Sequence, residues 1–109
     1  MKSLKEPFDL IKSGQKHIEI RLYDEKRKNL KVNDSIVFLK SPDCKDKVKV
    51  KVTHLARYSS LSELFNQIPS ENFGWDSKSI DWMLNKMYKI YTKDQENKYG
   101  IIAISIQLI

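Results

Sequence analysis

Residues 13–22 read Ser-Gly-Gln-Lys-His-Ile-Glu-Ile-Arg-Leu, and the hydrophobic period of the chain changes within this stretch. Before it, residues 4–13 carry apolar side chains at helical spacing, and Gly14 is suited to end a helix. From residue 17 to residue 22, apolar and polar side chains alternate strictly, which is the period of a half-buried strand. The stretch therefore predicts a short helix that ends at Gly14 and leads into a strand with a polar face.

The rest of the chain repeats these two patterns. Short apolar runs predict strands at residues 35–39, 47–53 and 101–109, and helical spacings predict helices at residues 60–69 and 80–91, with one further turn at 92–95. The last run is apolar and β-branched, so we expect a central strand that is buried on at least one face. Four strands and three short helices predict one α+β or small-barrel domain over residues 1–109.

Lysine alternates with valine in the strand predicted at residues 47–53. We expect the valines to face inward and three lysines to lie along one outward edge, namely Lys47, Lys49 and Lys51. Charge on an edge strand prevents pairing with other chains, so this row is interpreted either as edge protection or as a stripe that follows a phosphate backbone. A charged edge also favours a monomer.

The composition indicates a basic globular protein. Hydrophobic residues make up 40% and charged residues 31% of the chain, a balance that excludes a disordered or fibrous protein. Twenty Lys+Arg against fourteen Asp+Glu give a net charge of +6, which favours a polyanion or an acidic partner. The single cysteine, Cys44, excludes an internal disulfide and favours a reducing compartment.

The sequence argues against a membrane protein and against a metal-binding protein. No apolar run approaches the roughly 20 residues needed to span a bilayer, so we expect a cytoplasmic protein with no membrane partner. His17 and His54 are the two histidines, and no spacing of histidine with carboxylate resembles a zinc or iron site. We therefore predict neither a metal nor a cofactor.

The densest group of reactive side chains is Lys16, Glu19 and Arg21. The helix end delivers Lys16 to the start of the strand, which then presents Glu19 and Arg21 on one face. Arginine offers a planar fork for a phosphate or a base edge, lysine a point charge, and glutamate an acceptor for an amino group. The alternative is an ion pair on a solvated face without a functional role, which is a common arrangement.

The motif Gly-x-Lys-x-x-Glu-x-Arg at residues 14–21 resembles the ASCH family of PUA-like barrels. The resemblance covers nearly the whole chain: it begins at Pro7-Phe8, continues through residues 22–38, and ends in Lys-Tyr-Gly-Ile-Ile-Ala-Ile at residues 98–104. It implies a PUA-like β-barrel of five to six strands, with two or three short helices closing a cleft. It also implies that Lys16, Glu19 and Arg21 line this cleft and that nucleic acid is the ligand.

Two positions depart from the family pattern. Asn33 stands where the family commonly has glycine, and asparagine also tolerates positive φ, so we expect the turn before Asp34 to be kept. His17 stands where the family commonly has threonine, next to the predicted site, which would alter the choice of ligand.

The leading hypothesis is a module that binds RNA or a modified nucleoside in a basic cleft. An aromatic side chain such as Tyr23, Tyr58 or Trp75 would stack on a base. Trp82 and Tyr88 have the spacing of a buried helix stripe and are predicted to pack in the core. The predicted ligand-binding residues are Lys16, His17, Glu19, Arg21, Tyr23, Lys47, Lys49, Lys51 and Tyr58.

An enzyme is the second hypothesis. One branch of the family resembles an acetylcytidine amidohydrolase that uses a lysine, a threonine three residues later and a downstream glutamate. Lys16 matches the lysine, Glu19 replaces the threonine, and Glu71 matches the glutamate, so a hydrolase would rely on Lys16 and Glu19 to activate water. A ribonuclease that uses Lys16 and Arg21 is a variant, and an adaptor for an acidic protein is a third class.

Overall fold

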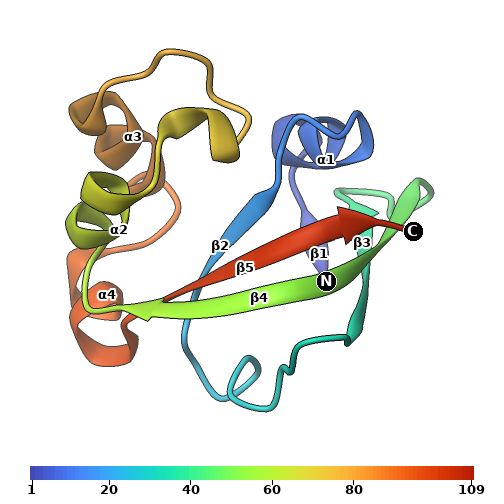
Figure 1. Cartoon of the computed structure of the whole chain (residues 1–109), viewed down its shortest axis with the longest axis horizontal. Helices are drawn as coiled ribbons and strands as arrows, with labels where there is room; N and C mark the ends of the chain where they lie inside the picture. Colours follow the sequence, from blue (N-terminus) through green and yellow to red (C-terminus); the bar gives the residue numbers. More distant parts are fainter.

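The computed structural model describes residues 1–109 as five strands and four short α-helices (Figure 1). The strands are β1 (Lys2–Ser3), β2 (Ile18–Leu22), β3 (Ser35–Lys40), β4 (Lys47–Tyr58) and β5 (Ile101–Leu108). The helices are α1 (Lys5–Lys12), α2 (Leu61–Gln67), α3 (Ile80–Met87) and α4 (Lys93–Tyr99), and a 3-10 turn occupies Ser70–Asn72. The predicted α+β class is confirmed, with more helices than expected and with β1 as an additional strand.

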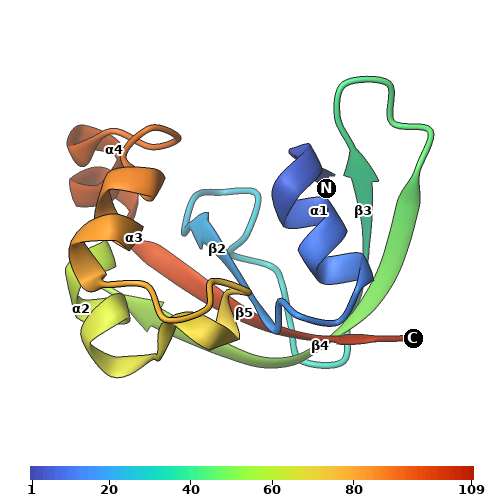
Figure 2. The same cartoon turned by 90° about the horizontal axis from the view of Figure 1, so that it is seen from above.

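The strands form one mixed sheet in the order β1-β3-β4-β5-β2, which curls into a half-barrel. The pair β1–β3 is parallel and the other pairs are antiparallel. The long strand β4 pairs with β3 through its first half and with β5 through most of its length, and a register shift lies between Val52 and His54. Figure 2 shows β4 bending along the sheet, as such an irregularity favours.

The expectation that residues 47–53 form an edge strand is wrong. β4 has hydrogen-bonded neighbours on both sides, and the edges of the sheet are β1 and β2. The predicted alternation is confirmed, because Val50 and Val52 are buried while the three lysines are exposed. Lysine and valine alternation shows which side chains share a face, whereas the neighbours of a strand depend on distant segments.

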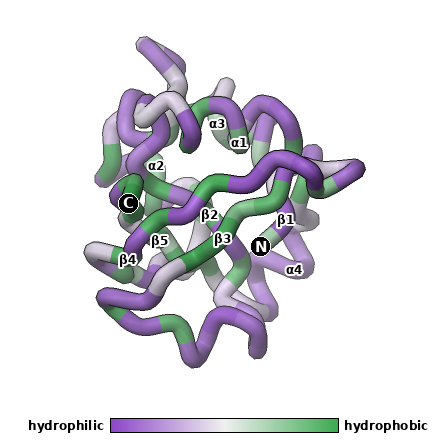
Figure 3. Tube along the Cα trace, turned by 90° about the vertical axis from the view of Figure 1, so that its right-hand side faces the viewer, coloured by the Kyte–Doolittle hydropathy of each residue, from purple (hydrophilic) through white to green (hydrophobic).

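Apolar side chains pack on both faces of the sheet. On one face, Ile20 and Ile101 pack with α2, α3 and the aromatic residues of the connecting segment. On the other, Phe38, Val50 and Ile104 pack against α1. The alternate residues of β5 belong to the two clusters in turn, which confirms the predicted central strand. Figure 3 shows hydrophobic and hydrophilic residues alternating along the strands.

Local signals set the helix ends and turns. The hydroxyl of Ser60 accepts from the backbone N–H of Glu63 and so caps the start of α2. Residues 80–91 were predicted as one helix, but α3 ends at Met87 and Thr92 caps the separate helix α4. Asn33 has φ of 78°, which confirms that the turn before Asp34 is kept. None of the helices has the length and apolar character needed to cross a membrane.

Candidate ligand-binding cavity

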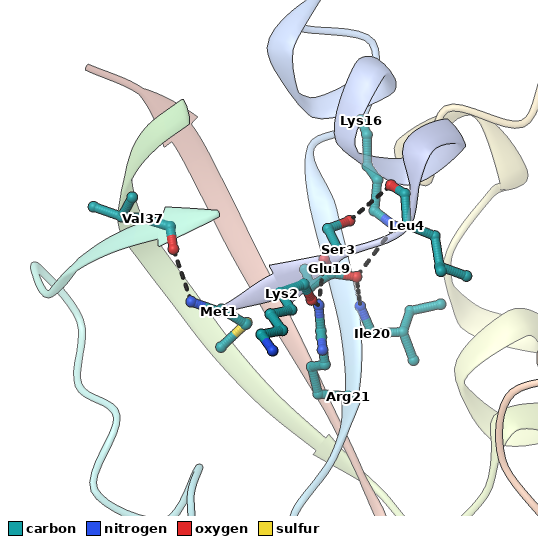
Figure 4. Close-up of polar contacts among 9 residues, drawn as sticks. All are labelled: Met1, Lys2, Ser3, Leu4, Lys16, Glu19, Ile20, Arg21 and Val37. Atoms are coloured by element: carbon teal, nitrogen blue, oxygen red, sulfur yellow. Dashed lines mark hydrogen bonds and ion pairs between the residues drawn. The ribbon is translucent and has the colours of Figure 1, made fainter. Parts of the chain in front are cut away.

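The half-barrel remains open at a seam between β1 and β2. These strands stand at opposite ends of the sheet order, and no backbone ladder joins them. A side chain bridges the seam instead, because the Arg21 guanidinium donates a hydrogen bond from Nη2 to the Lys2 carbonyl at 2.9 Å (Figure 4). The seam therefore places charged side chains where a closed barrel would have backbone hydrogen bonds.

Lys16, Glu19 and Arg21 meet at this seam. Glu19 Oε1 lies 3.2 Å from Lys16 Nζ and accepts from the backbone N–H of Ile20 at 3.1 Å, and Glu19 Oε2 accepts from Arg21 Nη2 at 3.4 Å (Figure 4). Glu19 is 4% and Lys16 6% exposed. Lys16 and Glu19 are thus buried together, and the solvated ion pair considered above is not what the chain forms.

The environment of Glu19 favours its charged form. Burial is the largest influence and by itself would raise the pKa of this carboxyl, but the charges of Lys16 and Arg21 and the hydrogen bonds from Lys16 and Ile20 outweigh it. The pKa of Glu19 is held below its ordinary value. At neutral pH the seam therefore contains one carboxylate between two cations.

The cluster lines a cavity of about 110 Å³, called here the Lys16 cavity. The indole of Trp75 forms part of its wall, 7% exposed and with its ring centroid 6.0 Å from Lys16 Nζ. Tyr91 forms another part, and burial raises the pKa of its phenol. The remaining lining includes apolar Leu4, Leu10, Ile20, Met87 and Ile90 together with Ser3, Glu6 and Lys86. The cavity is apolar around a charged floor.

The backbone places Trp75 beside Lys16. The segment before Trp75 lies antiparallel to the start of β2, where Lys16 pairs with Phe73 and the His17 N–H donates to the Asn72 carbonyl at 2.9 Å. Gly74 has φ of +80°, and a Cβ there would stand 3.1 Å from Leu10 Cδ1 of α1. Glycine therefore permits this segment to turn tightly against α1 and direct the indole into the cavity.

Other predicted binding residues lie elsewhere. His17 is exposed and lines a second pocket, which also includes Gly14 and Lys16. Tyr23 and Tyr58 line a third pocket, where the guanidinium of Arg57 lies 4.0 Å from the centroid of the Tyr23 ring. The structure therefore brings together four of the nominated side chains, Lys16, Glu19, Arg21 and Trp75, and places the nominated histidine and tyrosines outside their cavity.

The lysine row and Glu71 are also outside the Lys16 cavity. Lys47, Lys49 and Lys51 are exposed on β4 and none lines this cavity. Glu71 is exposed in the 3-10 turn, where its carboxylate accepts from the Ser70 hydroxyl at 3.4 Å. The catalytic set Lys16, Glu19 and Glu71 is therefore not assembled around one space. No group of three His, Cys, Asp or Glu side chains is placed to hold a metal ion.

Several polar residues that line the cavity were not predicted from the sequence, and one aromatic residue was predicted in the wrong place. Ser3 and Lys2 of β1 and Tyr91 after α3 line the cavity but lie far from the motif in the chain. Trp82 was predicted to pack in the core and is 37% exposed, which corrects that expectation, whereas Tyr88 packs partly buried against the core as predicted. The core-facing side of α3 is formed by the buried Met83 and Met87 together with the partly buried Ile80 and Leu84.

The sequence matches the family described as ASCH domain over residues 1–109. The chain is similar to the hypothetical archaeal protein PH0355, with 37% identity, a TM-score of 0.82 and 100% of both chains covered. It is also similar to protein PF0455 from Pyrococcus furiosus, with 34% identity, a TM-score of 0.73, and 100% of this chain and 98% of that chain covered. Protein EF3133 from Enterococcus faecalis shares the fold at 11% identity and a TM-score of 0.70, over 93% of this chain and 65% of that chain. No curated protein matches. The chain belongs to the ASCH domain family.

Proposed function

We propose that the Lys16 cavity binds a single nucleobase, presented by RNA or by a modified nucleoside. The observation that carries this proposal is the buried cluster of Lys16, Glu19 and Arg21 facing the indole of Trp75. ASCH domains are generally associated with RNA binding. The net charge of +6 supports the same class of ligand, because it attracts polyanions.

The size of the cavity restricts what enters it. Pockets for drug-sized ligands are roughly 300–1,000 Å³, and the Lys16 cavity is about 110 Å³. One planar ring with its exocyclic groups is the appropriate size, and a duplex is excluded from the cavity. Sequence-specific RNA recognition commonly uses such splayed-out single bases, stacked on aromatic side chains and hydrogen-bonded at their edges.

The floor of the cavity offers both donors and an acceptor. The Lys16 ammonium has three N–H donors, and the structure gives it one polar partner, Glu19. Its other donors suit a base carbonyl. The Glu19 carboxylate, ionised at neutral pH because its pKa is lowered, suits an amino group. A pyrimidine that carries an amino or amide group beside a ring nitrogen and a carbonyl matches this pattern.

Heteronuclear NMR tests the proposal. The labelled protein is titrated separately with a short single-stranded RNA, with cytidine and with acetylcytidine. We expect amide shifts centred on residues 16–21 and Trp75, and binding weakened roughly tenfold or more in Lys16→Met, because a charged hydrogen bond is lost. Lys12→Met, at an exposed position at the end of α1 and outside the cavity, is the matched control. Shifts confined to other surfaces, or no shift, would refute the proposal and leave an acidic protein partner as the next candidate.

Hydrolysis is the second candidate, and one observation favours it. An ionised carboxylate and a buried ammonium share the cavity, which are groups able to activate water and to stabilise an oxyanion. In amide hydrolysis, water adds to the acetyl carbon, the C–N bond breaks, and acetate and the amine are released. Acetate release from acetylcytidine that disappears in Glu19→Gln would establish it. Binding without acetate would leave the protein a binding module.

A further inference from the structure

Trp82 lies just outside the Lys16 cavity, in the first turn of α3. The Ser79 hydroxyl accepts from the Trp82 N–H at 3.1 Å and fixes the start of the helix. The indole of Trp82 meets the indole of Trp75 edge to face, with ring centroids 5.6 Å apart and an interplanar angle of 73°. An exposed indole is therefore held at a defined position, in contact with the aromatic wall of the cavity.

Two lysines flank the Trp82 ring. Lys78 Nζ is 4.9 Å and Lys86 Nζ 5.2 Å from its centroid. Lys78 is exposed, and its ammonium has no carboxylate partner, whereas Lys86 pairs with Glu6 at 3.1 Å. Lys86 also lines the Lys16 cavity, so one lysine borders both the cavity and the exposed indole.

The core of the protein does not explain this arrangement. The buried residues of α3 are Met83 and Met87, and Trp82 remains 37% exposed. The exposed Trp82 indole lies next to Lys78, whose ammonium has no carboxylate partner. Proteins recognise single-stranded nucleic acid with aromatic surfaces that stack on a base and cations that contact the backbone, and this arrangement offers both. An apolar protein partner would instead require these lysines to be desolvated.

We propose that Trp82, Lys78 and Lys86 form a second nucleotide position, so that the natural ligand is single-stranded RNA of two or more nucleotides and not a free nucleoside. This inference rests on the proposed function of the Lys16 cavity. One base occupies the cavity, its neighbour stacks on Trp82, and the phosphate between them lies near Lys86. Lys78 moves from the indole face to the backbone as the base stacks, which its flexible side chain permits.

The two tryptophans give a direct readout, because their indole N–H groups produce two resonances in a ¹⁵N-labelled protein. Trp82→Phe assigns them. We expect cytidine to shift the Trp75 resonance alone, and a dinucleotide or a short oligonucleotide to shift both. In Trp82→Leu, binding of the oligonucleotide should weaken roughly fivefold to 100-fold while binding of cytidine is unchanged, and Trp82→Phe should retain most of the affinity.

Charge variants test the backbone contact. Lys78→Gln should reduce the slope of log affinity against log salt by about 0.7, the value for one phosphate contact on a single strand. Lys45→Gln, in the exposed turn between β3 and β4, is the control and should leave the slope unchanged.

The outcomes separate the two proposals. If neither ligand shifts Trp75, the proposed function fails. If cytidine shifts Trp75 and the oligonucleotide binds equally well to the wild type and to Trp82→Leu, the second position is overturned while the cavity stands. If an acidic peptide shifts the Trp82 resonance and RNA does not, the surface belongs to a protein partner and the second position is equally overturned.

Discussion

Glu19 is the residue on which the cavity depends. It is buried between Lys16 and Arg21 and holds both cations in place at 3.2 Å and 3.4 Å. A buried pair contributes little net stability compared with an apolar replacement, but the loss of one partner leaves an unpaired charge. Removal of Glu19 is therefore expected to lower the stability of the protein, although Glu19 lies on the polar side of the alternating sequence pattern of β2.

We expect Glu19→Ala to lower the free energy of unfolding by about 3–5 kcal/mol at pH 7, because Lys16 is left buried without its carboxylate. The pKa of Glu19 in the folded protein is below its unfolded value. Its contribution is therefore full above an unfolded pKa of about 4.3 and is lost as pH falls through the folded value. Urea unfolding of the two proteins across pH 2–7 should show the difference shrinking at the acid end.

The exposed pair of Glu25 and Lys28 supplies the control for Glu19. Its atoms approach more closely, at 2.8 Å, but in water. Glu25→Ala should leave the unfolding midpoint unchanged within error at neutral pH. An equal effect of both substitutions would mean that the buried position of Glu19 does not matter.

At the scale of elements, Glu96 of α4 connects three helices. It is buried, accepts the backbone N–H of Leu61 at the start of α2 at 2.6 Å, and accepts the Tyr88 hydroxyl after α3 at 2.8 Å. The first contact satisfies a donor that the start of a helix leaves unpaired. α3 and the residues that follow it form one side of the Lys16 cavity. By binding Tyr88, Glu96 helps to fix the position of this side.

We expect Glu96→Ala to reduce stability by at least about 2 kcal/mol, since hydrogen bonds to a charged group contribute about 1.5–3 kcal/mol each. Tyr88→Phe should lose less, because only one of the two bonds is removed. Burial and the bond to Glu96 raise the pKa of Tyr88, so Glu96→Gln should lower that pKa toward the usual value in an ultraviolet titration. Asn97→Ala, exposed on the same helix, should change neither quantity.

At the scale of the whole molecule, the lysine row of β4 acts through the field of the protein. Lys47, Lys49 and Lys51 carry three positive charges in a protein whose net charge is +6, and they lie outside the cavity. Charges at a distance from a binding site mainly change the rate of encounter, and salt screens them over about 10 Å at 0.1 M. Under the proposed function, the row would therefore speed the approach of RNA to the protein.

The triple substitution of these lysines by glutamine should slow RNA association severalfold at low salt and leave dissociation unchanged, as stopped-flow fluorescence would show. The difference should vanish near 0.5 M salt. If dissociation accelerates instead, and RNA shifts the β4 amides, the row contacts the phosphate backbone directly, as the stripe interpretation of the sequence holds.

Local patterns were sufficient for most elements of the fold. The change of period at residues 13–22 predicted α1 and β2, the apolar runs predicted β3, β4 and β5, and Ser60 marked the start of α2. The resemblance to the ASCH family, together with the tolerance of asparagine for positive φ, predicted the turn at Asn33. Each of these features depends on a few neighbouring residues, so the sequence by itself determined them.

Only the tertiary structure decided where the faces of these elements point. Alternation grouped Glu19 with Arg21, but the packing of α1 and β1 against β2 buried Glu19. Pairing with β3 and β5 placed β4 inside the sheet. Helical spacing grouped Trp82 with a buried stripe, but the Ser79 cap and the packing of Met83 turned it outward. Periodicity records which side chains share a face, and what covers that face is set by contacts between distant segments, which bring Trp75 to Lys16.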